Sequence, residues 1–278
     1  MYLVAAGGDP RALHIQQVLA ATRSLPNSVV SHASALVCHG LPLPGRPGTP
    51  PSPHLTIPTS RWRTGPTARV HISPLGVEDV MTLDGLPITT VARTAVDVAR
   101  RSSIFDAQMV VDAAARLLMG TPGTPSLAAP DLRARVHDEV EREAAAHKLR
   151  DVVSRQVGWP GIRRARQAVD WAEPASESPA ESWSRVRFIL WNLPTPLCGA
   201  PVTVADGTTY WADFLWPEHG VIGECDGASK YVDPDVLLQE KRRQIALERA
   251  GYTVIRWLPA EVLTGGSDLR RHLHDALG

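Results

Sequence analysis

The residues best placed for chemistry are three acidic side chains near the carboxyl end of the chain. Glu224 and Asp226 lie two apart in the segment 221–226, whose composition predicts a β-strand. Because alternate side chains of a strand point to the same face, both carboxylates are expected on one face. Asp213 lies in the preceding predicted strand, 210–215, and only a short turn separates the two. We therefore expect antiparallel pairing that brings Asp213 close to Glu224.

Carboxylates inside apolar strands are expensive to desolvate, and neighbouring carboxylates repel one another. A hard divalent cation such as Mg²⁺, or Mn²⁺ in its place, would neutralise them with oxygen ligands and keep water molecules for chemistry. The alternative is a structural role, in which the acids form salt bridges with basic residues of the chain, namely Lys230, Lys241, Arg242 and Arg243.

Glu181 also has two interpretations. The run Ser178-Pro179-Ala180-Glu181 has the pattern of a capping box, with Ser178 as the N-cap and Pro179 at the first helical position. In that role Glu181 reaches back to the start of its own helix. A glutamate in a first helical turn could instead point at a metal ion on the adjacent sheet, directly or through water.

The elements that position these groups follow from the periodicity of the apolar residues and from the Gly and Pro breaks. In residues 1–173 we expect helices at 9–22, 31–39, 91–100, 104–118, 131–153 and 161–172, and strands at 54–58, 68–73 and within 83–88. In residues 174–278 we expect a helix at 180–191, a meander of strands at 202–204, 210–215 and 221–226, a helix at 237–250, a strand at 252–257 and a final helix. The fold class is therefore α/β (α+β), with a domain boundary at the polar stretch 173–179.

The acidic residues are also where the chain resembles a known family. Glu181-Ser182 at the start of a helix, followed by YWADFLWPEHGVIGECDGASKY, EKRRQIALERAGY and VIRW, resembles the Vsr-like branch of the PD-(D/E)XK nuclease superfamily. This branch includes the very-short-patch mismatch endonuclease and a large bacterial family related to it. The resemblance covers residues 174–278. It implies a restriction-endonuclease-like mixed sheet flanked by helices, and Mg²⁺-dependent phosphodiester cleavage by a metal-activated water.

By position, the resemblance assigns Asp213 as the central metal ligand, Glu224 and Asp226 as the second motif, and Glu181 as the helix carboxylate. One departure matters. The superfamily has a lysine two residues after the second acid, and Asp226 stands in its place here. We expect Lys230 or Lys241 to supply that charge. Histidines that the repair endonuclease has in this region are absent from CDGASKY.

Residues 1–173 resemble a second group of proteins. VVSHASALVCHGLPL, HLTIP, VHIS and GLPITTVARTAVDVAR are similar to the region that follows the winged helix in actinobacterial AbiEi-type antitoxins, which commonly carry the same nuclease-like carboxyl-terminal part. We expect this chain to lack the winged helix, because it begins with Met1-Tyr2-Leu3 where that domain's last strand would end. The resemblance implies an α+β and helical domain and a cognate protein partner.

Further basic and histidine residues were weighed against ordinary structural roles. Arg61 and Arg63 could hold phosphate, with Trp62 stacking on a base, or they form a solvated strand edge. The basic helix that contains Arg242 and Arg243 is a second candidate contact with nucleic acid. Arg163, Arg164 and Arg166 form a basic helix patch that phosphate could use, although such runs are usually only solvated. His32 and His39 lie seven residues apart on a predicted helix, and we interpret them as ordinary helix residues.

Composition narrows the remaining function classes. Lys and Arg number 29, as do Asp and Glu, so the net charge is zero and any affinity for DNA must come from local patches. Three widely spaced cysteines predict neither a zinc site nor a disulfide framework, and fit a cytoplasmic protein. No run long enough to span a membrane and no signal peptide is present, so no membrane partner is expected. No phosphate-binding glycine motif predicts a nucleotide cofactor.

These observations predict a Mg²⁺-dependent DNA endonuclease or nickase. The alternative is an antitoxin-like regulator, whose nuclease fold has lost turnover and binds DNA or a partner protein. The missing lysine and the antitoxin-like first part of the chain motivate this second hypothesis.

Overall fold

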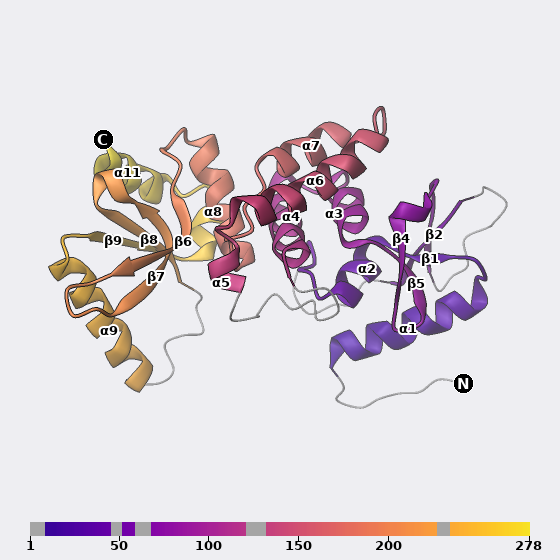
Figure 1. The fold of residues 1–278 in the computed structure, drawn as a ribbon, viewed down its shortest axis with the longest axis horizontal. Coiled ribbons are helices and arrows are strands. Elements are labelled where there is room, and N and C mark those ends of the chain that lie inside the picture. Colours follow the sequence, from indigo (N-terminus) through magenta and orange to yellow (C-terminus); the bar gives the residue numbers. More distant parts are fainter. Residues whose placement is uncertain (1–8, 46–51, 59–67, 121–131, 227–233) are drawn as a thin grey trace. The chain divides into compact units, whose positions relative to one another are not determined.

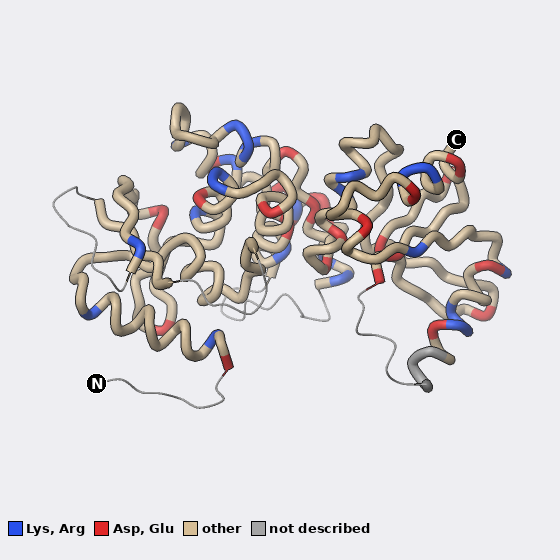
Figure 2. Tube along the Cα trace, turned by 180° about the vertical axis from the view of Figure 1, so that it is seen from behind, with Lys and Arg blue, Asp and Glu red and all other residues tan. Residues whose placement is uncertain are grey.

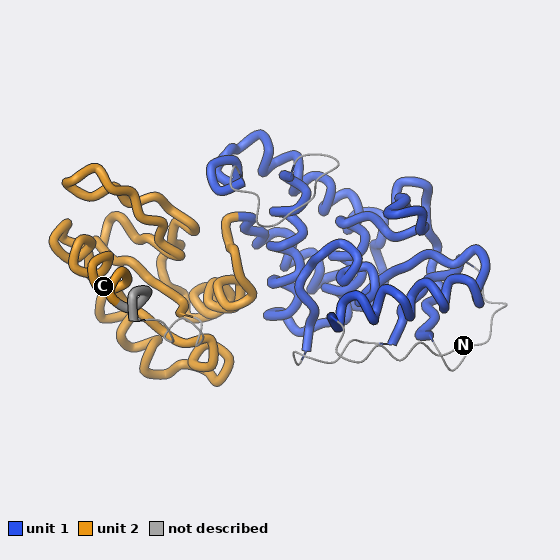
Figure 3. The backbone as a smooth tube through the Cα atoms, turned by 90° about the horizontal axis from the view of Figure 1, so that it is seen from below, with its two compact units in different colours: residues 1–174 blue, residues 175–278 orange. Residues whose placement is uncertain are grey.

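The structure is a computed structural model with the mixed α/β fold that the sequence predicts. It divides into two compact units, Met1–Pro174 and Ala175–Gly278 (Figures 1 and 3), one residue from the boundary expected at 173 and 174. The structure describes residues 9–45, 52–58, 68–120, 132–226 and 234–278, and the side chains of residues 234–237 lie outside this description.

The first unit contains a five-stranded sheet in the order β3-β2-β1-β5-β4. β2 lies antiparallel to β1 and parallel to β3, whereas β5 lies parallel to β1 and antiparallel to β4. A turn at Asp84 and Gly85 joins β4 to β5, and both residues have positive φ angles, 48° and 79°, as a type I′ hairpin requires. The strands are β1 (Val29–Val30), β2 (His54–Ile57), β3 (Arg69–Ile72), β4 (Val80–Leu83) and β5 (Leu86–Thr89). The sequence missed β1, which is too short to show alternation.

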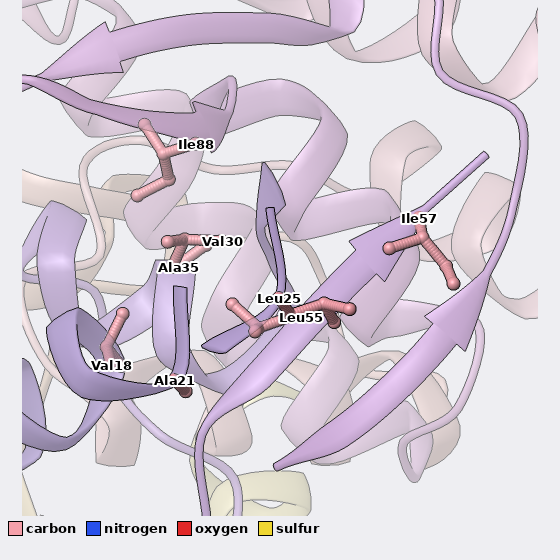
Figure 4. Close-up of a cluster of buried hydrophobic side chains, with 8 residues drawn as sticks. All are labelled: Val18, Ala21, Leu25, Val30, Ala35, Leu55, Ile57 and Ile88. Carbon is pink, nitrogen blue, oxygen red and sulfur yellow. The ribbon is translucent and has the colours of Figure 1, made fainter. Parts of the chain in front are cut away.

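Two helices pack on this sheet, α1 (Pro10–Ser24) and α2 (His32–His39). The carboxylate of Asp9 caps α1 by accepting a hydrogen bond from the backbone N–H of Arg11 at 3.0 Å, as predicted. Apolar side chains from both helices and three strands form one buried cluster (Figure 4), made of Val18, Ala21, Leu25, Val30, Ala35, Leu55, Ile57 and Ile88.

The rest of the first unit is helical. After the 3₁₀ turn η1 (Val77–Asp79) and the β4–β5 hairpin come α3 (Val91–Ala99), α4 (Ile104–Leu118), α5 (Leu132–Arg135), α6 (Glu139–Arg155) and α7 (Ile162–Asp170). The single helix expected at 131–153 is wrong, because the chain breaks between α5 and α6. Asp138 starts α6 afresh, and its carboxylate accepts a hydrogen bond from the N–H of Glu141 at 2.9 Å.

A buried arginine connects the hairpin to this helical part. Arg93 on α3 is 2% exposed and lies 2.7 Å from the carboxylates of both Asp79 and Asp97. The guanidinium groups of Arg93 and Arg100 lie 5.3 and 4.9 Å from the ring centre of Trp159, within cation–π range. Arg93 shares the compensation of these two buried charges with Arg155, which lies 2.6 Å from Asp79, and with Arg100, which lies 3.1 Å from Asp97.

The second unit contains a four-stranded sheet in the order β6-β7-β8-β9. β6, β7 and β8 form the predicted antiparallel meander, and β9 returns through α9 to lie parallel to β8. The elements are α8 (Pro179–Leu190), β6 (Leu197–Thr203), β7 (Thr209–Trp216), the 3₁₀ turn η2 (Pro217–His219), β8 (Val221–Cys225), α9 (Pro234–Arg249), β9 (Thr253–Trp257), α10 (Pro259–Leu263) and α11 (Ser267–Leu277).

One face of this sheet carries aromatic side chains. Phe188 of α8 meets Phe214, Trp216 and Trp257 edge-on, with ring centres 5.1 to 5.7 Å apart. Gly223 makes this packing possible, because a Cβ atom there would lie 2.6 Å from the Trp257 ring and 3.0 Å from the Trp216 ring. The aromatic layer therefore holds α8 against the middle of the sheet.

A separate apolar cluster joins α9 to the sheet. Leu247 of α9 packs with Leu215 of β7 and Ile222 of β8, and all three are buried. Strand alternation places Glu224 on the same face as Ile222, opposite Gly223 and Cys225. The acidic residue is thus directed to the face that α9 covers.

Charge is mixed along the chain. Figure 2 shows basic and acidic segments interspersed within each unit, in keeping with the equal numbers of the two kinds of residue. Within the described ranges, no helix has the length and apolar character needed to cross a membrane.

Replacing Arg93 with Ala is expected to destabilise the protein strongly, because it removes a buried guanidinium that pairs with both Asp79 and Asp97. The expected loss in the free energy of unfolding is about 3–5 kcal/mol, measured by urea denaturation. Arg150→Ala is the control, since the Arg150–Glu143 pair is exposed, and it should cost less than about 1 kcal/mol. Equal effects of the two changes would contradict the role given to Arg93.

Candidate functional site

The predicted acidic residues gather where β7 and β8 diverge. The two strands pair antiparallel with Phe214 opposite Gly223. Beyond that pair, the Asp213 carboxylate accepts a hydrogen bond from the backbone N–H of Cys225 at 2.9 Å. The side chain of Asp213 therefore reaches from β7 across to β8, next to Glu224 and Asp226, as the sequence predicts.

Glu224 is matched by two arginines. It is 2% exposed, and its oxygens lie 2.7 Å from a nitrogen of Arg243 on α9 and 2.8 Å from a nitrogen of Arg256 on β9. These contacts are ion pairs without hydrogen-bond alignment. Burial raises the pKa of Glu224, while the two guanidinium groups lower it and nearby Asp213 and Asp226 raise it further. The positive charge beside Glu224 comes from the chain itself.

Arg256 also joins Glu224 to two further acids. Its guanidinium lies 3.3 Å from Asp226 and 3.2 Å from Glu240 of α9. Glu224 and Arg256 face each other across the parallel register of β8 and β9. Arg243 is one of the four bases named for the structural alternative, whereas Arg256 was not among them. The available signal was an arginine inside an otherwise apolar strand.

Glu181 forms the predicted cap. Ser178 Oγ accepts from the Glu181 N–H at 3.2 Å and donates to the Glu181 carboxylate at 2.6 Å. The other carboxylate oxygen accepts from the N–H of Glu177 at 2.7 Å. Burial, and then the negative charge of Asp213, raise the pKa of Glu181 to about 8, even though these hydrogen bonds favour the charged form. Glu181 therefore caps its own helix and also lies close enough to Asp213 for the charge of Asp213 to act on it.

Cys225 lies among the carboxylates. Burial raises the pKa of its thiol to about 12, and the charges of Asp213, Glu181 and Asp226 add to the effect, against a hydrogen bond from Ser184. Of these acids, Asp226 shares Arg256 with Glu224 at 3.3 Å. The negative charges of Asp213 and Glu181 thus act on the same thiol as that of the arginine-paired Asp226.

The donor chemistry suits a divalent cation only in part. In the described portion of the chain, no three His, Cys, Asp or Glu side chains are arranged as a metal-binding group. Glu224 does not fit the predicted role of metal ligand, because two guanidinium groups occupy its surroundings. Asp213 supplies oxygen donors near Glu181, and Asp226 supplies oxygen donors next to Cys225, one of them 3.3 Å from Arg256. That number is compatible with Mg²⁺, which is commonly held by one or two carboxylates together with water and substrate phosphates.

The basic residues expected at the site differ in their surroundings. Lys241 and Arg242 are exposed on α9. Arg243 turns inward, where it donates to the carbonyl oxygen of Trp211 at 2.6 Å and pairs with Glu224. Arg243 is therefore a structural residue here, which departs from its expected contact with nucleic acid. Lys230, Arg61 and Arg63 lie outside the described residues.

Comparison with known proteins finds relatives in Mycobacterium tuberculosis. They include one protein from strain CDC 1551/Oshkosh and one from strain ATCC 25618/H37Rv, each named an uncharacterized protein. Each is 26% identical to this chain over 202 residues, which are 73% of this chain. The chain spans 65% of the length of these relatives. No family model and no solved structure matches the chain.

Replacing Glu181 with Gln is expected to stabilise the protein increasingly as pH rises from 5 to 9. The folded state holds the Glu181 proton up to a pKa of about 8, above the usual 4.5. Wild-type stability therefore falls as pH rises through this window, whereas glutamine does not titrate. The melting temperature of the variant relative to wild type should increase by about 4 °C or more between pH 5 and pH 9. A difference independent of pH would contradict the raised pKa.

Proposed function

We propose that the second unit is a Mg²⁺- or Mn²⁺-dependent DNA endonuclease or nickase with a restriction-endonuclease-like fold. The main support is the Asp213 carboxylate, which reaches across to the backbone N–H of Cys225 between Glu224 and Asp226. Burial, and then the negative charge of Asp213, raise the pKa of nearby Glu181 to about 8. A divalent cation would relieve this repulsion. The order and spacing of the nuclease-like motifs over residues 174–278 give the proposal its reaction class.

In this proposal Asp213 and Asp226 hold the cation, which when bound supplies an activated water and charge neutralisation at the scissile phosphate. Glu181 holds a proton near neutral pH and can exchange it with a water molecule beside the cluster. Glu224 acts as a positioning residue, because its ion pairs fix Arg243 and Arg256 next to the acids. Exposed Lys241 is the described lysine available to contact a phosphate.

The second candidate function is a regulator that binds DNA or a partner protein without cleaving. Two observations favour it. Asp226 stands where the nuclease superfamily has a lysine, and Glu224 is paired with arginines. A centre neutralised by the chain's own arginines can keep its fold without a metal ion. This candidate predicts salt-dependent binding of DNA, or capture of a cognate protein, with no change in the DNA.

A cleavage assay separates the two candidates. Purified protein is given supercoiled, linear and mismatched DNA with Mg²⁺, with Mn²⁺ or with a chelator. Metal-dependent nicking or cutting is expected, and Asp213→Asn should reduce the rate by about 100-fold or more, because it removes a charged ligand. Asp206→Asn, at an exposed hairpin turn of the same sheet, is the matched control and should cleave normally.

Equal cleavage by wild type and Asp213→Asn would dismiss the assigned centre. DNA binding that weakens with salt, without cleavage under any metal condition, would support the regulator instead. Absence of cleavage, DNA binding and any captured partner would contradict both candidates.

Binding of Mg²⁺ is expected to release a proton from Glu181 at pH 7, because a cation beside Asp213 favours the charged carboxylate. Calorimetric titration in buffers of different ionisation enthalpy measures this release. Glu181→Gln should bind Mg²⁺ without the buffer dependence. Proton release of the same size from the variant would assign it to another group.

A further inference from the structure

Three histidines from different elements meet in the first unit. His32 begins α2, His54 begins β2, and His71 lies on β3. The rings of His32 and His71 stack with centres 3.6 Å apart and planes 12° apart. A ring nitrogen of His71 lies 3.1 Å from one of His54, at hydrogen-bond distance. The sequence does not reveal this histidine cluster of His32, His54 and His71, because its members come from three separate elements.

The surroundings of the histidine cluster are basic. Burial lowers the pKa of His32 to about 2, of His71 to about 3 and of His54 to about 4. The other groups that lower these pKa values are all basic, and apart from the three rings themselves they are His14, Arg69, Arg100 and Arg101. Basic side chains from several elements thus act together on the three rings of the histidine cluster.

Ring geometry argues against a metal ion here. The lone pair of an imidazole nitrogen lies in the plane of its ring, so a shared metal ion must lie in the planes of all its histidine ligands. The rings of His32 and His71 are stacked with their planes nearly parallel and their centres 3.6 Å apart, so the two planes do not meet close to the rings. His54 and His71 already direct a nitrogen at each other. The neighbouring arginines would also repel a cation.

Arg100 and Arg101 differ in whether an acid of the described residues already pairs with them. Arg100 is buried and is paired with Asp97 at 3.1 Å, and it donates to the carbonyl oxygen of Pro160. Arg101, the next residue, is exposed and makes no ion pair with any residue that the structure describes. Arg101 can therefore offer its guanidinium to a ligand beside the histidine cluster.

The start of α2 adds donors to the same place. Ser31 is the N-cap residue, but its hydroxyl makes no capping hydrogen bond. It accepts instead from Thr56 at 2.8 Å and contacts His32 at 3.1 Å. The first-turn N–H groups of α2 thus lack a side-chain cap. The backbone of His32 has a φ angle of +51°, a left-handed conformation that is uncommon for residues other than glycine. Backbone strain of this kind is concentrated at functional positions.

We propose that the histidine cluster, Arg101 and the start of α2 bind a phosphate-type dianion. A doubly charged anion would pair with Arg101, accept hydrogen bonds from the helix amides and turn the imidazoles from repelling bases into donors. The phosphate comes either from a nucleic acid backbone or from a small phosphate compound. The proposal does not depend on nuclease activity in the second unit.

The test uses the full chain without added metal. Inorganic phosphate and a short oligodeoxynucleotide are titrated separately at constant ionic strength, and histidine C2–H resonances and the melting temperature are recorded. Binding is expected to shift three histidine resonances together and to raise the melting temperature. Arg101→Gln should weaken binding about 10-fold or more. Arg163→Gln, which removes an exposed arginine from α7, should leave it unchanged.

The two titrations distinguish the sources of the phosphate. Binding of both compounds, weakened by Arg101→Gln, supports a site that accepts free phosphate. Binding of the oligonucleotide alone, with the same sensitivity, supports nucleic acid as the ligand. Failure of both compounds to bind, or equal binding by Arg101→Gln and Arg163→Gln, overturns the proposal.

A pH series gives an independent measure with sulfate, which stays doubly charged between pH 5 and pH 8. Sulfate binding should tighten as pH falls, because the anion raises the pKa of histidines that burial and basic neighbours hold low. His71→Gln should flatten this dependence. An affinity that does not change with pH in the wild type would count against the participation of the histidines.

Discussion

The second unit depends on one electrostatic constraint, that a buried carboxylate requires positive charge beside it. Glu224 meets this constraint through Arg243 and Arg256, which come from α9 and β9. One side chain of β8 is therefore tied to both elements that follow it in the chain. Removing Glu224, or removing its arginines, would leave the remaining charge unpaired in a low-dielectric interior, where an unpaired ion is costly. The ion pairs thereby fix the strand end at which the remaining acids lie.

The acidic cluster has two sides with different chemistry. Around Glu224 the charge is balanced by arginines and the arrangement needs no ligand. Around Cys225, the charges of Asp213 and Asp226 act on a thiol that Glu181 also influences, and the pKa of Glu181 rises. A nuclease and a regulator with a nuclease-like fold differ on this second side alone. The fold is compatible with either, because its stability is tied to the arginine-paired side and not to the bound ion.

The first unit gathers basic side chains around rings that burial keeps uncharged. His32, His54 and His71 lie together under the influence of arginines, and burial keeps the rings in the neutral form. The ionic network around Arg93 balances its own charges and serves the packing of α3. The histidine cluster has no such internal balance. Two places with an excess of one charge, one acidic and one basic, are the features of this protein that call for partners of opposite charge.

The sequence by itself determined the elements and their local ends. The caps at Asp9 and Ser178, the hairpin at Asp84 and Gly85, and the pairing of β7 with β8 all involve residues close in the chain, so periodicity and turn chemistry are sufficient to predict them.

Tertiary structure alone decided which side chains meet across distant segments. Arg256 reaches Glu224 only because β9 returns parallel to β8, and His71 meets His32 only because β3 joins the far side of β2. The order and register of strands separated by long connections depend on the packing of the whole sheet. A local sequence pattern carries no record of that packing, so the partners of Glu224 and of His32 could not be predicted from it.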